Sequence, residues 1–227
     1  MNNRGGEITY YKTFSQTGEY HKSIGKENED AIKVVINGNY FYCVISDGAG
    51  CSKYAKEAAW CTVNAVADYC YNNGTSFFDS TRYFAAKQLV FDVQEALYNT
   101  AKDLNTELSQ MMCTLVLLCI NTDTLQYTTI HIGDGLIAKK SDDSVEIISY
   151  PHNGINSNIT YFINDLNFIE LLRVKAGVLT LNDVFIILSD GGYNTLNNNL
   201  KDIFAFVEKS TDDVSACCVC IDNDFQF

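Results

Sequence analysis

Two short apolar runs in the chain end in the same three residues. Residues 41–45 read Phe-Tyr-Cys-Val-Ile, residues 184–188 read Val-Phe-Ile-Ile-Leu, and each run is followed by Ser-Asp-Gly. Runs of this length that are rich in β-branched and aromatic residues predict core strands. Asp47 and Asp190 would then stand at the ends of two buried strands, where a carboxylate needs either a backbone turn or a cation as its partner.

The first of these strands belongs to a predicted β-hairpin over residues 30–48. Two apolar or alternating runs flank Asn37-Gly38, which is the strongest short hairpin signal. Antiparallel pairing about this turn brings Asp30 and Asp47 to the same end of the ladder. A turn explains one Asp-Gly after a strand, but two carboxylates at one edge are harder to explain as turn chemistry.

The rest of the chain is divided into blocks of helical and strand patterns. Apolar residues at helical spacing predict helices over 52–73 and from 79 to about 108. Strands are expected over 8–18, 111–121, 125–135, 136–140, 144–150, 168–174, 184–192 and 210–221, with a short helix near 200–208. This order predicts an α+β fold of antiparallel sheets with helices outside, and the two inner sheet faces would form the core.

Composition and charge narrow the class of protein. With 227 residues, 47% of them hydrophobic, the chain suits a single domain over residues 1–227. The formal charge of −12 argues against nucleic acid and against a membrane surface as partners. The chain has no apolar stretch of about 18 residues and no signal-peptide pattern, so we expect a soluble, cytoplasmic protein.

Cysteine and histidine do not outline a zinc site. Cys217 and Cys220 form a CxxC, but they lie in a predicted strand and would point to opposite faces. The three histidines are widely scattered along the sequence. Several of the nine cysteines fall inside apolar runs, which fits reduced thiols in a cytosol.

Acidic residues gather instead at the ends of predicted strands. They are Glu29-Asp30, Asp47, Asp190 and Asp212-Asp213. Clustered like charges coexist only when protons or cations neutralise them. Oxygen ligands alone favour Mg²⁺ or Mn²⁺ over zinc.

Five segments in order resemble the metal-dependent PPM/PP2C-type protein serine/threonine phosphatases. They are NEDA (28–31), SDGAG (46–50), CTLVLLCI followed by HIGDGLIA (131–138), IILSDGGYNTL (186–196) and TDDVSACCV (211–219). The stretches at 18–31 and 152–162 look most like the compact prokaryotic branch of that family. The resemblance covers nearly the whole chain and implies a four-layer αββα sandwich.

The resemblance also implies a site with two Mg²⁺ or Mn²⁺ ions at one end of the sheets. Asp47 would bridge both ions, the carbonyl of Gly48 would bind one, and Asp190 and Asp212 would complete the shell of the other. Asp30 would hold a metal-bound water. Asp213, Glu29 and Glu107 are further candidates for metal binding or for contacts around the site, with Glu107 a candidate for a third ion.

The chain departs from the family pattern at two functional positions. Many members carry a leaving-group acid, His, after the metal-binding Asp-Gly, but this chain has Ala49, so the general acid is unassigned; His21 or a metal-bound water could serve. The family's phosphate-binding Arg before the NED motif is also missing, and Lys26 or His21 is the candidate replacement. His131, which precedes Gly133-Asp134, is expected to be structural.

Two functions follow from the resemblance. The first is a phosphatase in which a water activated between two ions hydrolyses phosphoserine or phosphothreonine, with no protein nucleophile. Its partners would be a phosphorylated protein substrate and a cognate Ser/Thr kinase in the same pathway. The alternative is a catalytically impaired pseudophosphatase that binds phosphoproteins as a regulatory module. Retention of the four aspartates favours the enzyme, whereas Ala49 and the missing Arg favour the alternative.

Overall fold

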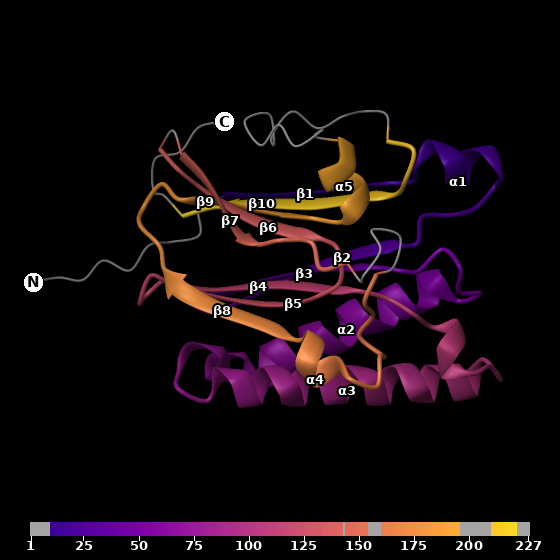
Figure 1. The fold of residues 1–227 in the computed structure, drawn as a ribbon. Coiled ribbons are helices and arrows are strands. Elements are labelled where there is room, and N and C mark those ends of the chain that lie inside the picture. Colours follow the sequence, from indigo (N-terminus) through magenta and orange to yellow (C-terminus); the bar gives the residue numbers. More distant parts are fainter. Residues whose placement is uncertain (1–9, 143, 154–159, 196–209, 222–227) are drawn as a thin grey trace, which may run out of the picture.

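Ten strands form two five-stranded antiparallel sheets in the computed structural model, which describes residues 10–142, 144–153, 160–195 and 210–221. The β3 sheet has the order β2 (Asp30–Asn37), β3 (Tyr40–Asp47), β4 (Leu115–Asn121), β5 (Gln126–Ile132) and β8 (Arg173–Val178). The β10 sheet has the order β1 (Tyr10–Gln16), β10 (Val214–Cys220), β9 (Val184–Leu188), β6 (Leu136–Ser141) and β7 (Ser144–Ser149). The two sheets lie face to face, as Figure 1 shows.

Alternate residues of the central strands fill the space between the sheets. From the β3 sheet, Phe41 and Ile45 are fully buried there, and from the β10 sheet Phe185 and Ile187 meet them. The neighbouring residues in these strands point outward, because successive side chains of a strand alternate between its faces. This alternation explains why both strands read as continuous apolar runs: each is covered on both faces.

Two long helices cover the outer face of the β3 sheet (Figure 1). They are α2 (Ala55–Asn73) and α3 (Arg82–Asp103), linked by the 3₁₀ turn η1 (Gly74–Phe78) and followed by η2 (Leu108–Gln110). Buried side chains of both helices pack on those of the sheet in one apolar cluster. In the described ranges, no helix is both long enough and apolar enough to cross a membrane.

Three short helices complete the described fold. They are α1 (Glu19–Ser23), α4 (Phe168–Leu171) and α5 (Asp190–Thr195). Helix α5 contacts β9 and β10 on the outer side of the β10 sheet, so helices flank both sheets. The α+β sandwich expected from the sequence is therefore confirmed.

Most predicted elements are confirmed, the hairpin in particular. β2 and β3 pair with Asp30 directly opposite Asp47, as the Asn37-Gly38 turn requires. Cys217 packs between the sheets whereas Cys220 packs on the outer face of the β10 sheet, so the CxxC side chains do diverge. The helix predicted near 200–208 lies outside the described residues.

The strand predicted over 168–174 is wrong in its position. Residues 168–171 form the helical turn α4, and the strand β8 begins only at Arg173. The turn buries Phe168 and Leu171, which are three residues apart and so share one side of a helix. The apolar run at 168–174 therefore contains a buried helical turn and the start of an edge strand.

Candidate metal centre

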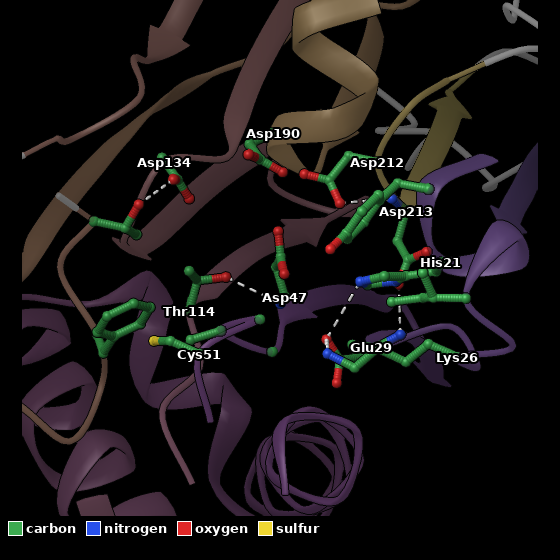
Figure 2. Close-up of a pocket in the computed structure, with 17 residues that line it drawn as sticks. His21, Lys26, Glu29, Asp47, Cys51, Thr114, Asp134, Asp190, Asp212 and Asp213 are labelled. Carbon is green, nitrogen blue, oxygen red and sulfur yellow. Dashed lines mark hydrogen bonds and ion pairs between the residues drawn. The ribbon is translucent and has the colours of Figure 1, made fainter. Parts of the chain in front are cut away.

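A cavity of about 730 Å³ opens at the end of the sheets where β3 and β9 finish. Figure 2 shows Asp47, Asp134, Asp190 and Asp212 around it, with Glu29 and Asp213 on the side of α1. The other lining residues are Tyr20, His21, Ile24, Lys26, Gly48, Ala49, Gly50, Cys51, Thr114, Thr160 and Phe162. Among these lining residues, only Lys26 and His21 carry a basic group, so carboxylates dominate the cavity.

Asp47 is held in place by the neighbouring strand region. Its backbone N–H donates to Thr114 Oγ1 at 3.0 Å, and its carbonyl accepts from the Thr114 N–H at 2.9 Å. The next residue must be glycine, because a Cβ at Gly48 would lie 2.3 Å from the backbone oxygen of Ala55 at the start of α2. The side chain of Asp47 and the backbone of Gly48 therefore reach the cavity on a rigid turn.

Asp190 is positioned by pairing between β9 and β10. The Ser189 N–H donates to the Ser215 carbonyl, and the Ser215 N–H donates to Ser189 Oγ, each at 2.9 Å. Asp190 then begins α5, and its Oδ1 atom is buried without a hydrogen-bond partner. A buried carboxylate oxygen with no donor needs an explanation, and a bound cation would supply one.

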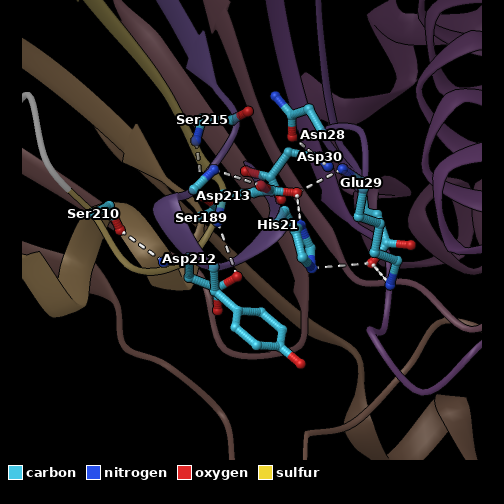
Figure 3. Close-up of polar contacts among 12 residues, drawn as sticks. His21, Asn28, Glu29, Asp30, Ser189, Ser210, Asp212, Asp213 and Ser215 are labelled. Carbon is cyan, nitrogen blue, oxygen red and sulfur yellow. Dashed lines mark hydrogen bonds and ion pairs between the residues drawn. The ribbon is translucent and has the colours of Figure 1, made fainter. Parts of the chain in front are cut away.

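Asp212 and Asp213 are adjacent but have different environments. The carboxylate of Asp213 is buried and accepts hydrogen bonds from the backbone N–H of Gly18 at 2.8 Å and of Glu29 at 2.6 Å. It also pairs with His21 Nδ1 at 2.9 Å (Figure 3). Asp212 is exposed, and its Oδ1 accepts only the N–H of Asp213 among the contacts of the described chain. The chain thus uses Asp213 as an internal anchor.

His21 and Lys26 both line the cavity, as the sequence predicted for a phosphate-binding role. Lys26 Nζ contacts Glu29 Oε2 at 2.7 Å, and His21 Nε2 lies 3.7 Å from the same oxygen. Glu29 therefore joins the two candidate phosphate-binding residues on one wall of the cavity (Figure 2).

Asp30 is not among the residues that line this cavity. It is buried beside Asp213, Ser189 and Ser215 (Figure 3), and neither of its carboxylate oxygens has a hydrogen-bond partner within the described residues. Burial raises the pKa of the Asp30 carboxyl to about 8, and the charges of Asp190 and Asp213 add to this shift. Glu29, the preceding residue, is the one that reaches the cavity.

Burial and mutual repulsion also perturb the carboxyls that do line the cavity. Burial raises the pKa of Asp47 well above its usual range, and the charges of Asp30 and Asp190 add to this. Burial raises the pKa of Asp190 to about 6, and the charges of Asp134 and Asp212 contribute. Such carboxyls share a site comfortably only when protons or cations compensate them.

The structure also places residues that the sequence did not single out. Thr114 orients Asp47, the hydroxyl of Thr160 donates to Asp134, and the exposed Cys51 lies at the cavity wall. Of these residues, only Cys51 could have been found from the sequence, because it directly follows the SDGAG segment. Glu107 lies elsewhere, beside Lys102 and Gln110 in a separate hollow. His131 is fully buried and contacts Ser149 and Arg173, as expected for a structural histidine.

The donor set fits hard divalent cations. Among the described residues, no three His, Cys, Asp or Glu side chains converge closely enough to hold an ion by themselves. Mg²⁺ does not require such a cluster, because it keeps several waters and is commonly bound through one or two carboxylates. The unpartnered Oδ1 of Asp190 and the carboxylate-rich lining therefore match Mg²⁺ or Mn²⁺.

Comparisons with known proteins identify the family and the fold of the chain. The chain matches the sequence model "Protein phosphatase 2C" over residues 17–218. No curated protein matches it significantly. Among solved structures it is similar to the Stp1 serine/threonine phosphatase of Staphylococcus aureus, with 17% identity, a TM-score of 0.75, and coverage of 96% of this chain and 97% of that one.

Two further structures extend the likeness. The S. agalactiae serine/threonine phosphatase has 16% identity and a TM-score of 0.72, with 94% of this chain and 100% of that one covered. RsbX, solved in complex with magnesium, has 14% identity and a TM-score of 0.61, with 95% and 97% covered. At these identities the structures establish a shared fold, while the family match spans most of the sequence. The chain belongs to the protein phosphatase 2C family.

Proposed function

We propose that this protein is a metal-dependent protein serine/threonine phosphatase that hydrolyses phosphoserine and phosphothreonine with a water activated between two Mg²⁺ or Mn²⁺ ions. The observation that carries the proposal is the meeting of Asp47, Asp190 and Asp212 in one cavity from the ends of different strands. Their mutual repulsion destabilises the chain unless it is compensated, so a binding module without ions would have no use for it.

Four groups would hold the ions. Asp47 would bridge them, the Gly48 carbonyl would bind one, and Asp190 and Asp212 would bind the other. Asp212 is favoured over Asp213, because the Asp213 carboxylate is already occupied by two backbone N–H groups and His21. When bound, the ions would lower the pKa of a shared water and neutralise charge on the phosphoryl oxygens.

The role of holding a metal-bound water passes from Asp30 to Glu29 in this proposal. Glu29 lines the cavity, whereas Asp30 is buried beneath it. Asp30 then supports the site from below, where its raised pKa favours a protonated carboxyl that can donate a hydrogen bond.

Lys26 and His21 would receive the substrate phosphate. Lys26 provides the one ammonium group in the described cavity lining, and its contact with Glu29 holds it at the wall. His21 is oriented through Nδ1 by Asp213, so its Nε2 faces Glu29 on the cavity side. A protonated His21 in this position could supply the leaving-group proton that Ala49 cannot.

The alternative, a pseudophosphatase that binds phosphoproteins without turnover, rests on Ala49 and the missing arginine. Both functions would place a phosphorylated protein in the cavity, opposed by a Ser/Thr kinase of the same pathway. A cytoplasmic location stays a prediction, consistent with the nine cysteines.

Hydrolysis of a phosphothreonine peptide tests the proposal. Purified protein should release phosphate with Mn²⁺, lose this activity in EDTA, and lose it on Asp190→Asn. Asp68→Asn is the matched control, because Asp68 is exposed on α2 far along the helix from the cavity. Absence of turnover with Mn²⁺, together with retained phosphopeptide binding in calorimetry, would replace the enzyme with the pseudophosphatase.

A further inference from the structure

The outward face of α3 carries three aromatic side chains in a regular row. Phe84, Phe91 and Tyr98 are spaced seven residues apart and are 68%, 49% and 53% exposed. Seven residues are two turns of a helix, so the three rings stand about 10 Å apart on one side of it. Helix α3 is the outermost element on this side of the sandwich (Figure 1), and it contributes no residue to the metal cavity.

The row of rings is held in a defined shape. Phe91 makes an edge contact with the buried Phe168 of α4, with ring centroids 5.0 Å apart and planes at 85°. Lys87 Nζ lies 4.7 Å from the centre of the Phe84 ring, and Lys102 Nζ lies 5.3 Å from that of Tyr98. Rigid aromatic side chains lose little conformational entropy on association, which suits an interface.

The exposed positions of α3 form one continuous strip along the helix. Phe84, Gln88, Phe91, Glu95, Tyr98 and Lys102 are all exposed and alternate by four and three residues, so they share one face. An ordinary surface helix presents charged and polar residues on its outer side, whereas α3 places an aromatic ring at every second position of this row.

The charges of Lys87 and Glu95 favour one orientation for a second helix packed on this face of α3. In an antiparallel pair with its two-fold axis at Phe91, residues equally far from Phe91 stand at the same level along the pair. Phe84 is then level with Tyr98 of the other copy, and Lys87 is level with Glu95. A parallel pair would instead bring Lys87 level with Lys87 and Glu95 level with Glu95, which like-charge repulsion disfavours.

We propose that the outward face of α3 is a dimerisation surface whose partner is a second copy of this chain, packed antiparallel about Phe91. The surface is self-complementary, as the interface of a two-fold dimer must be. Tyr83 of α3 and Ile169 of α4 flank it with further exposed apolar area. The proposal is independent of the phosphatase activity, because no described cavity residue takes part.

Sedimentation velocity over a range from micromolar to submillimolar protein tests this arrangement. We expect concentration-dependent dimers of the unmodified chain and monomers for Phe91→Glu, which places two like charges on the axis. Tyr71→Glu is the matched control, because Tyr71 is a similarly exposed aromatic residue on α2, and it should leave dimerisation unchanged. Unmodified protein that stays monomeric throughout would overturn the proposal, as would dimers that resist Phe91→Glu.

A charge reversal tests the orientation with variants that should all fold. Lys87→Glu alone, or Glu95→Lys alone, should weaken dimerisation by about tenfold, because each replaces two attractive pairs by two repulsive ones. The double variant Lys87→Glu with Glu95→Lys should restore the original dissociation constant. Failure of the double variant to restore it would refute antiparallel packing about Phe91.

Discussion

The two Ser-Asp-Gly segments have the same sequence but are constructed differently. Asp47 ends β3, and Thr114 binds both its N–H and its carbonyl, so the residue is fixed within one sheet. Asp190 begins α5, and its position depends on the pairing of Ser189 with Ser215 in the other sheet. The same three residues therefore deliver a carboxylate to one cavity from a strand end and from a helix start.

The surroundings of Asp47 and Asp190 suit a central and a peripheral metal ligand, respectively. Asp47 is next to Gly48 and faces Asp30 across the hairpin, and burial followed by repulsion from Asp30 and Asp190 holds its pKa well above the usual range. Asp190 is of the same intermediate exposure as Asp47, and its pKa is raised to about 6, first of all by burial. In the proposed site Asp47 would serve both ions and Asp190 one, and the following experiments test this contrast.

The largest effect is expected from replacing the two aspartates separately. Asp47→Asn should abolish binding of both Mn²⁺ ions and lower kcat by about 10³-fold or more, whereas Asp190→Asn should leave one ion and lower kcat by about 10²–10³-fold. Isothermal titration calorimetry gives the stoichiometry without depending on activity. Equal stoichiometry in the two variants would contradict the distinction.

A second effect concerns the metal-free protein and pH. The raised pKa values mean that the folded state holds these protons more tightly than the unfolded state, so their stabilisation is complete below about pH 4 and is lost as pH rises through about 6 for Asp190 and about 8 for Asp30. The Tm in EDTA should therefore fall between pH 5 and 8, by on the order of 5 °C.

The same measurement has two internal controls. Mn²⁺ should remove most of the fall in Tm, because the ions replace the protons as compensating charge. Asp190→Asn in EDTA should remove the share of the fall that Asp190 contributes below about pH 6 and leave the fall between about pH 6 and 8. A Tm in EDTA that stays level across this range would show that the carboxylates do not repel one another as inferred.

Smaller effects are expected from replacing the residues that position the two aspartates, Thr114 for Asp47 and Ser189 for Asp190. Thr114→Val removes the hydroxyl that accepts the Asp47 N–H and should weaken Mn²⁺ binding by about 10–100-fold, with Thr114→Ser as the conservative control. Ser189→Ala leaves the Ser215 N–H without its acceptor and should cost about 1–3 kcal/mol in the free energy of unfolding. Calorimetry measures the Mn²⁺ affinity, and urea unfolding measures the free energy of unfolding. If Thr114→Val lowered the free energy of unfolding but left the Mn²⁺ affinity unchanged, Thr114 would have no role in positioning Asp47 for metal binding.

The smallest effect is expected at Lys26, which lies on the cavity wall away from both Asp47 and Asp190. Lys26→Gln should raise KM for a phosphopeptide by about three- to tenfold while changing the free energy of unfolding by about 0.5 kcal/mol or less, since partly exposed ion pairs contribute little to stability. Lys56→Gln is the matched control, because Lys56 pairs with Glu27 outside the cavity. Equal changes in KM for both variants would point to general electrostatics.

The sequence predicts the framework well where the signals are local. Asn37-Gly38 determines the register that puts Asp30 opposite Asp47, and apolar runs with β-branched residues locate the central strands. The segment 168–174 shows the limit: an apolar run does not distinguish a buried helical turn from a strand, and only packing of Phe168 against α3 decides.

Site residues were harder to assign because their roles depend on distant contacts. Glu29 and Asp30 are adjacent and point to different sides, and the face that meets the cavity depends on how β2 sits against β10. The anchoring role of Asp213 arises from Gly18, His21 and Glu29, which are nearly the whole chain away. No local pattern in TDDVSACCV distinguishes it from Asp212.

The bonds from Asp213 to Gly18 and Glu29 also have a consequence for biosynthesis. Residues 30–178 supply every strand of the β3 sheet, so that sheet can form while the chain is still being made. The cavity wall with His21 and Glu29, in contrast, is tied to a residue just before β10, which comes last in sequence among the described strands. A nascent chain, or a fragment cut before residue 210, therefore lacks the Asp213 anchor, and this wall of the cavity can be completed only after that residue has been synthesised.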